Sequence, residues 1–134
     1  PDQHGILRGK TLIARETPQA MRNGCSITTT LLAKDTSHTT VFPVFSPGGG
    51  FGIPEMENAG DFVAVPIPST FQVLPWAPKT GWILCDGYLG NGEPVPFSTR
   101  HILKQALVRS PMKASITSPV SRSSVISTSL KTRC

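Results

Sequence analysis

Residues 62–85 read FVAVPIPSTFQVLPWAPKTGWILC, and this stretch decides the fold class. It contains runs of β-branched and aromatic residues at 62–65, 70–74 and 82–85, and proline or glycine separates one run from the next. Short runs of this composition, bounded by turn residues, are typical of β-strands. The stretch therefore predicts three strands in the centre of the chain.

A hairpin is predicted directly after these strands. Asn91-Gly92 can supply the two positive φ values that a type I′ turn needs. The arm at 93–97 contains Pro94 and Pro96, which have no N–H group to donate to a strand ladder. We therefore expect this arm to lie at the edge of a sheet.

Helices are predicted on both sides of the strand region. Residues 17–24 begin with Thr-Pro and end in Gly24, which is the usual order of start and stop signals for a short helix. A brief extended run precedes it at 12–14. Ser98 is a good N-cap for a helix over 99–108, whose apolar residues recur at helical spacing. We expect the second helix to pack on the sheet, which makes the fold class α+β.

The region between the first helix and the strands has weaker signals. Residues 26–40 are rich in Thr and Ser and are compatible with either β or irregular structure. Residues 41–53 contain two prolines and the run Gly48-Gly49-Gly50, so they should form an exposed loop that moves unless something docks on it. No Gly-Lys-Ser/Thr follows the glycines, and a docking loop is therefore favoured over a nucleotide site.

The charge of the chain is concentrated at its C-terminal end. The 134 residues carry a formal charge of +5, yet residues 1–108 hold eight basic and eight acidic residues. Residues 109–134 hold five basic residues, no acidic residue and eleven Ser or Thr. Apolar residues are too sparse there to offset the entropy of ordering, so this tail is expected to be disordered. The five positive charges leave nonspecific nucleic-acid association through the tail as a third, weaker hypothesis. Disorder in solvent is favoured over it, because the tail has no aromatic residue that could stack on a base.

Residues with catalytic or metal-binding chemistry do not form a recognisable set. The three cysteines have no CxxC spacing and the three histidines are far apart, so no metal site is predicted. Cys85, beside Asp86, lies in an apolar run and is interpreted as a packed core thiol. Trp76 and Trp82 are expected to pack in the core or in turns. No stretch reaches the roughly 20 apolar residues of a membrane helix, and a reducing, cytoplasmic setting is expected.

Four segments nevertheless share their order and spacing with one known family. They are GxxRGK at 5–10, the glycine loop after Phe45, PSTFQVLPW at 68–76 leading to Cys85-Asp86, and GxP at 92–94 followed by Ser98-Thr99-Arg100. Together they resemble the N-terminal β-grasp domain of the glutamine synthetase family, most closely its type III, or GlnT-like, branch. The resemblance covers about residues 2–108.

This resemblance implies a fold and a reaction. Residues 1–108 would form an incomplete, β-grasp-like mixed sheet with one or two helices, without the first strand of that fold, and 109–134 would be the unrelated tail. The family joins ammonia or an amine to the γ-carboxylate of glutamate through a γ-glutamyl phosphate, using ATP and Mg or Mn. Its large C-terminal domain holds most of the ligands, so this chain is expected to carry no catalytic, cofactor-binding or metal-binding residue of its own.

The glycine loop has a specific role in the family. Members form homo-oligomeric stacked rings, and each N-terminal domain lends this loop to the active site of the neighbouring subunit. The resemblance assigns that role here to Phe45, Ser46, Gly48, Gly49 and Gly50. Members usually carry an aspartate after the phenylalanine, which attracts ammonium, whereas this chain has Ser46. The change favours a larger amine, or a loss of activity.

Two functions from different classes are therefore expected. The first is a fragment of a glutamine synthetase family ligase that lacks the catalytic domain and is inactive alone. The alternative is a noncatalytic interaction module that docks on a full-length synthetase or another partner through its sheet edge and glycine loop. Because an incomplete sheet exposes backbone, we also expect poor solubility or obligate association of the isolated chain.

Overall fold

Strand β3 (Asp61–Pro66) is the centre of a three-stranded antiparallel sheet in the computed structural model, which describes residues 2–110 and 128–131. It lies between β2 (Cys25–Thr28) and β6 (Cys85–Tyr88). Buried and more exposed residues alternate along β3, as expected for a strand with one face on the core. The predicted strand at 62–65 is confirmed.

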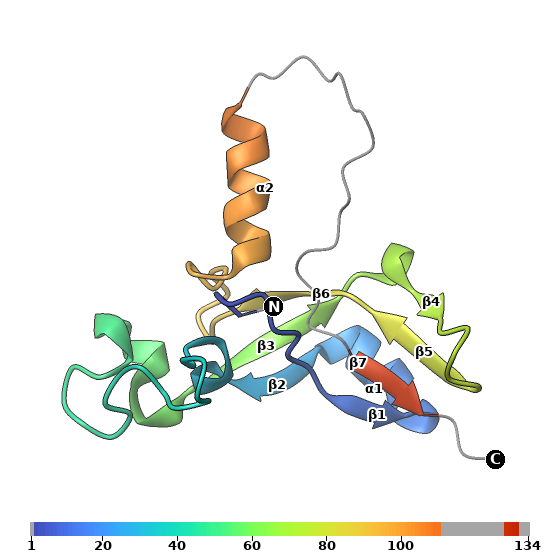
Figure 1. Ribbon diagram of the computed structural model, residues 1–134, viewed down its shortest axis with the longest axis horizontal. Helices are drawn as coiled ribbons and strands as arrows, with labels where there is room; N and C mark the ends of the chain where they lie inside the picture. The colour runs from blue at the N-terminus through green and yellow to red at the C-terminus, as the bar shows by residue number, and fades with distance from the viewer. Residues whose placement is uncertain (1, 111–127, 132–134) are drawn as a thin grey trace.

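A second sheet has the strand order β1-β7-β5-β4 (Figure 1). Its members are β1 (Thr11–Ile13), β4 (Gln72–Val73), β5 (Thr80–Ile83) and β7 (Thr128–Lys131). The β1–β7 pair is parallel and the other two pairs are antiparallel, so this sheet is mixed. Strand β7 belongs to the segment 109–134 that was predicted to be a disordered tail. Most of that prediction concerns residues 111–127 and 132–134, which lie outside the described residues.

One extended segment serves both sheets. The sequence predicted a single strand at 82–85, but β5 ends at Ile83 and β6 begins at Cys85, each in a different sheet. At Leu84 the N–H donates to Oγ1 of Thr70 over 2.9 Å, and the C=O accepts from the N–H of Ile67 over 2.8 Å. These two bonds give the backbone N–H and C=O groups of Leu84 partners at the point where the chain passes from one sheet to the other.

The predicted strand at 70–74 is shorter in the structure. Only Gln72–Val73 pair as β4, because Pro68–Thr70 form a single 3₁₀ turn, η5. Thr70 closes this turn through its hydroxyl, which donates to the C=O of Ile67 over 2.7 Å. The same oxygen accepts from Leu84, so Thr70 is used for the turn and for the change of sheet rather than for a ladder.

The hairpin after β6 has a different turn from the one predicted. Leu89 accepts from the N–H of Gly92 over 2.9 Å, which places Gly90 and Asn91 in the centre of the turn. Neither has a positive φ, whereas Gly92 has φ +86°. The geometry is therefore a three-residue loop that ends in a left-handed glycine, not a type I′ turn. The prediction of an edge arm is confirmed, since Val95 pairs with Gly87 outside the three strands.

The first predicted helix is confirmed as α1 (Thr17–Asn23), which follows a short 3₁₀ turn, η1 (Ala14–Glu16). Gly24 ends it with φ +72° and donates its N–H to the C=O of Ala20 over 2.9 Å. A Cβ at this position would lie 2.5 Å from Cγ1 of Val63, so the turn and the packing on β3 both require glycine.

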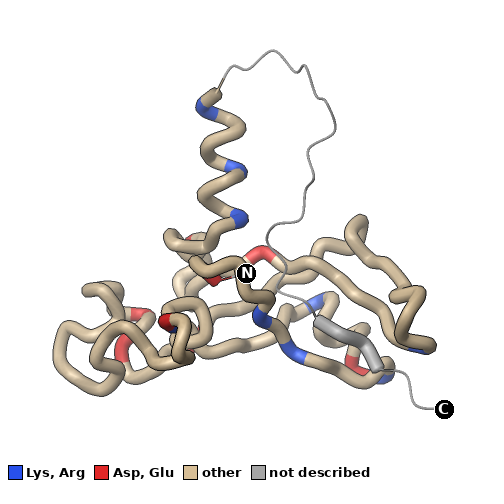
Figure 2. The backbone as a smooth tube through the Cα atoms, in the orientation of Figure 1, with Lys and Arg blue, Asp and Glu red and all other residues tan. Residues whose placement is uncertain are grey.

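The second helix, α2 (Thr99–Arg109), does not pack on a sheet as predicted. None of its residues is buried, and Figure 1 shows that it projects away from the sheets. Its apolar residues are left in solvent: Leu107 is 67 % exposed and Val108 is 86 % exposed. The helix meets β6 through its basic side instead, where Asp86 forms ion pairs with Arg100 (2.9 Å) and Lys104 (2.6 Å). In Figure 2, α2 carries basic residues (blue) along its length and no acidic residue (red).

The core lies between the β2-β3-β6 sheet and the segment that runs from β2 to β3. That segment contains three short turns: η2 (Thr29–Leu32), η3 (Gly50–Gly52) and η4 (Pro54–Ala59). The buried side chains of the core are Ile27, Leu32, Ala33, Phe42, Met56, Phe62, Ala64, Cys85, Leu89 and Val95. Cys85 is packed as predicted, and the α+β class is confirmed.

Trp76 departs from its prediction. It was expected to pack, but its side chain is 73 % exposed in the turn between β4 and β5, and Trp82 is partly buried. No helix within the described residues is long and apolar enough to span a membrane.

Replacing Thr70 tests the junction between the two sheets. Thr70→Val keeps the shape of the side chain but leaves the N–H of Leu84 without its acceptor, and we expect it to lower the free energy of unfolding by about 1–3 kcal/mol. Thr70→Ser keeps the hydroxyl and should cost less. Urea unfolding followed by circular dichroism measures both, and equal losses in the two variants would contradict this role.

Candidate functional site

The glycine loop at 43–53 has an exposed tip and a packed base. Phe45 is 79 % exposed, and Ser46 and Gly48 are exposed beside it. Gly49 and Gly50 are buried, and Gly49 donates its N–H to the C=O of Ser46 over 2.9 Å. The prediction of an exposed loop over 41–53 therefore holds for most of the segment, and its buried residues are Phe42, Gly49 and Gly50.

Contacts with the body fix the base of the loop. Asn58 donates its N–H to the C=O of Val44 over 3.1 Å, and Phe42 is buried in the core. A Cβ on Gly49 would lie 2.3 Å from the C=O oxygen of Pro43. The backbone can approach this closely only because Gly49 has no side chain.

Phe51 follows the glycines in an unusual conformation. It has φ +60°, and Gly50 and Gly52 on either side have φ +71° and +72°. A non-glycine residue in this region carries backbone strain. The turn directs the Phe51 ring toward two other phenylalanines: its centre is 4.9 Å from that of Phe42 and 6.1 Å from that of Phe97, both edge-to-face.

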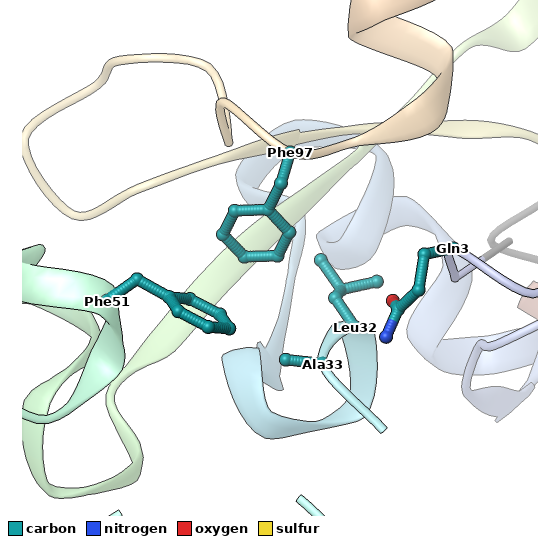
Figure 3. Close-up of a pocket in the computed structure, with 5 residues that line it drawn as sticks. All are labelled: Gln3, Leu32, Ala33, Phe51 and Phe97. Atoms are coloured by element: carbon teal, nitrogen blue, oxygen red, sulfur yellow. The ribbon is translucent and has the colours of Figure 1, made fainter. Parts of the chain in front are cut away.

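An apolar pocket of about 420 Å³ lies beside this ring (Figure 3). The described residues that line it are Gln3, Leu32, Ala33, Phe51 and Phe97. They come from the N-terminal segment, η2 and the residue after it, η3, and the residues before α2, so the fold brings together positions almost a hundred residues apart. In Figure 3 the two rings lie on one side of Leu32 and Ala33, and Gln3 lies on the other.

The N-terminal wall of the pocket is held by a buried ion pair. The Asp2 side chain is 0 % exposed and binds Nε and Nη2 of Arg8 at 3.0 and 2.8 Å. It also accepts the backbone N–H groups of His4 and Ile6. Burial by itself raises the pKa of Asp2, but the hydrogen bonds from Arg8, Ile6 and His4 outweigh it, and the net pKa is lowered.

Metal-binding and nucleophilic groups do not gather in the described residues. No group of three or more His, Cys, Asp or Glu side chains within 2–110 and 128–131 could hold a metal ion. Burial raises the pKa of the Cys25 thiol, although the charge of Lys10 acts in the opposite direction. Cys25 is therefore not an activated nucleophile. The sequence analysis predicted that ATP and Mg or Mn bind to the large C-terminal domain of the family and not to this chain. This stays a prediction.

The predicted loop residues and the pocket are adjacent, but they are not the same site. Phe45, Ser46 and Gly48 lie at the exposed tip, whereas Gly49 and Gly50 connect that tip to Phe51. Their role in a neighbouring subunit stays a prediction. The pocket was not predicted. Phe51 could have been noticed because it directly follows the glycines of the loop. No pattern in the sequence, however, indicates that Phe51 lies near Phe97 or Gln3.

Comparison with known proteins identifies the family. No family model matches the sequence. The chain is similar to γ-glutamylanilide synthase of Acinetobacter sp, with 43 % identity over 109 residues that make up 79 % of this chain and 22 % of that protein. Glutamate–isopropylamine ligase of Pseudomonas sp is 32 % identical over 107 residues, which are 79 % of this chain and 22 % of that protein. Type-1 glutamine synthetase 2 of Dictyostelium discoideum is 31 % identical over 106 residues, which are 79 % of this chain and 19 % of that protein.

The chain belongs to the glutamine synthetase family. It spans about a fifth of the length of the curated relatives it matches. The predicted family is confirmed, and its type III branch stays a prediction.

Two glycines with the same backbone angle test how the loop is held. Gly48→Ala adds a Cβ at φ +72° with nothing within 4 Å, so we expect only the conformational cost of about 1–2 kcal/mol. In Gly50→Ala the Cβ would also lie 2.6 Å from Cβ of Met56, and the loss should be larger by about 1–3 kcal/mol. Equal free energies of unfolding in urea would show that the base is not packed in this way.

The Asp2 ion pair predicts a loss of stability in acid. Because the pKa of Asp2 is lowered in the folded state, its contribution is present above the ordinary value of 3.8 and is lost as the pH falls through the lower value. Asp2→Asn should cost about 1.5–3 kcal/mol at neutral pH and flatten the acid limb of the stability curve. Urea unfolding at several pH values measures this, with Glu16→Gln, an exposed carboxyl, as the control. An unchanged acid limb in Asp2→Asn would contradict the assignment.

Proposed function

We propose that this chain is the part of a glutamine synthetase family ligase that presents residues 45–48 to an active site completed by another subunit. The observation that carries the proposal is the 43 % identity to γ-glutamylanilide synthase over 79 % of the chain. The exposed loop tip on a packed base supports it, because a loop that reaches a partner must be both accessible and positioned. The chain by itself would be inactive.

The reaction that we propose is the ATP-dependent joining of an amine to the γ-carboxylate of glutamate, with Mg or Mn bound outside the described residues. Ser46 supplies no negative charge at the tip, which removes a charge partner for ammonium. The names of two relatives, an anilide synthase and an isopropylamine ligase, support an amine larger than ammonia as the substrate. The free cysteine Cys25 agrees with a reducing, cytoplasmic setting.

Two assays test the proposal. The isolated chain, given glutamate, ATP, Mg and aniline, should release no phosphate, and turnover would contradict the need for another domain. A chimera in which residues of this chain replace the matched stretch of the Acinetobacter enzyme should assemble and ligate the amine. A folded but inactive chimera would overturn the proposed role.

Replacing Ser46 in that chimera tests the choice of amine. Ser46→Asp restores a negative charge at the loop tip, so kcat/KM for ammonia relative to aniline should rise about tenfold, the effect of one charged hydrogen bond. Ser46→Asn is the neutral control of similar shape and should leave the ratio unchanged. An equal effect of both variants would exclude charge as the cause.

The alternative function is a noncatalytic interaction module, and the exposed apolar residues of α2 favour it. Ile102 is 51 % exposed and Leu107 is 67 % exposed on a helix that packs against neither sheet. Sedimentation of the full chain with the Acinetobacter enzyme distinguishes the two functions. Binding that Leu107→Glu abolishes, without any ligation in the chimera, would support the module.

A further inference from the structure

The pocket beside Phe51 has the composition of a small-molecule site. Its volume of about 420 Å³ falls in the range of ligand pockets, roughly 300–1,000 Å³. Four of its described lining residues, Leu32, Ala33, Phe51 and Phe97, offer only carbon atoms from their side chains, and Gln3 offers one amide. Because no charged side chain is among them, a charged ligand would lose its hydration without a partner.

Phe51 gives the pocket its aromatic wall at a cost in stability. Its side chain is 56 % exposed, although burying a ring of that size is favourable, and its backbone is strained at φ +60°. The Phe51 and Phe97 rings meet edge-to-face at 6.1 Å, with an interplanar angle of 67°. Both rings line the open pocket, so a third ring could join them in a further edge-to-face or offset contact.

Gln3 determines which polar group a ligand should carry. Its Nε2 donates to the C=O of Lys34 over 2.8 Å, which also fixes the orientation of the amide. Among the described residues no group donates to its Oε1, so this oxygen remains as a hydrogen-bond acceptor. Figure 3 shows the Gln3 amide across Leu32 and Ala33 from the two rings. A ligand that lies over Leu32 and Ala33 would have its ring at one end and a donor at the other.

From this geometry we infer that the pocket binds a neutral aromatic molecule of one or two rings that carries an N–H or O–H donor. The ring packs against Phe51 and Phe97, and the donor binds Oε1 of Gln3. This site is separate from the loop tip at 45–48 and does not depend on the proposed ligase function. It assigns the described part of the chain a ligand of its own.

Indole is a suitable probe, because it is neutral, has two fused rings and carries a single N–H donor. Saturation-transfer NMR with the full chain detects its binding, and titration calorimetry measures the dissociation constant. 1-Methylindole lacks the donor and should bind about fivefold more weakly, the effect of one hydrogen bond. Phe51→Gly removes the ring and suits the left-handed backbone, and Phe97→Leu keeps the apolar volume. Each should weaken indole binding about fivefold to tenfold.

Phe45→Ala is the matched control, because Phe45 belongs to the same loop, is exposed and does not line the pocket. It should leave indole binding within about twofold of the original chain, since it removes no pocket contact. Binding that is absent in the original chain, or unchanged in both Phe51→Gly and Phe97→Leu, would overturn the site. Equal affinities for indole and 1-methylindole would overturn the role of Gln3.

Discussion

The packing of Phe62 at the centre of β3 is the constraint on which the rest of the structure depends. Its side chain is 1 % exposed, and it pairs in register with Ile27 of β2. On the other side β6 supplies Gly87, where a Cβ would lie only 3.2 Å from the Phe62 ring. The missing side chain of Gly87 on β6 leaves the space that the large Phe62 ring on the central strand occupies, as close packing of a core requires.

The segment between β2 and β3 folds against this core, and the loop and the pocket follow from that. Phe42 and Met56 are buried in the same cluster as Phe62, one on each side of the glycines. With both ends held, residues 45–48 are left as a short exposed tip, while Gly50, Phe51 and Gly52 make the left-handed turn that directs the Phe51 ring to Phe97. The accessible loop and the aromatic wall are thus two results of one packing arrangement.

Family membership and local chemistry describe different parts of the function. Identity to the relatives extends over most of the chain, which is why a shared reaction can be proposed although the chain spans about a fifth of their length. Ser46 and the uncharged pocket are two features of this chain. Ser46 favours a larger amine over ammonium, because it supplies no negative charge. The pocket favours an uncharged ligand, because none of its described lining side chains is charged. The exposed apolar side of α2 is a third such feature, and it is the reason for retaining an interaction module as the alternative.

Local signals in the sequence were enough for the α+β class, the central strand, the first helix, the edge arm and the family, because each depends on neighbouring residues or on matched motifs. Tertiary contacts decided the rest. Thr70 binds Leu84 at the point where one predicted strand divides between two sheets, and α2 meets β6 through its basic side at Asp86 while its apolar residues stay in solvent. The pocket joins Gln3, Phe51 and Phe97, whose proximity depends on how the whole chain packs, and no periodicity or spacing along a sequence encodes such a long-range contact.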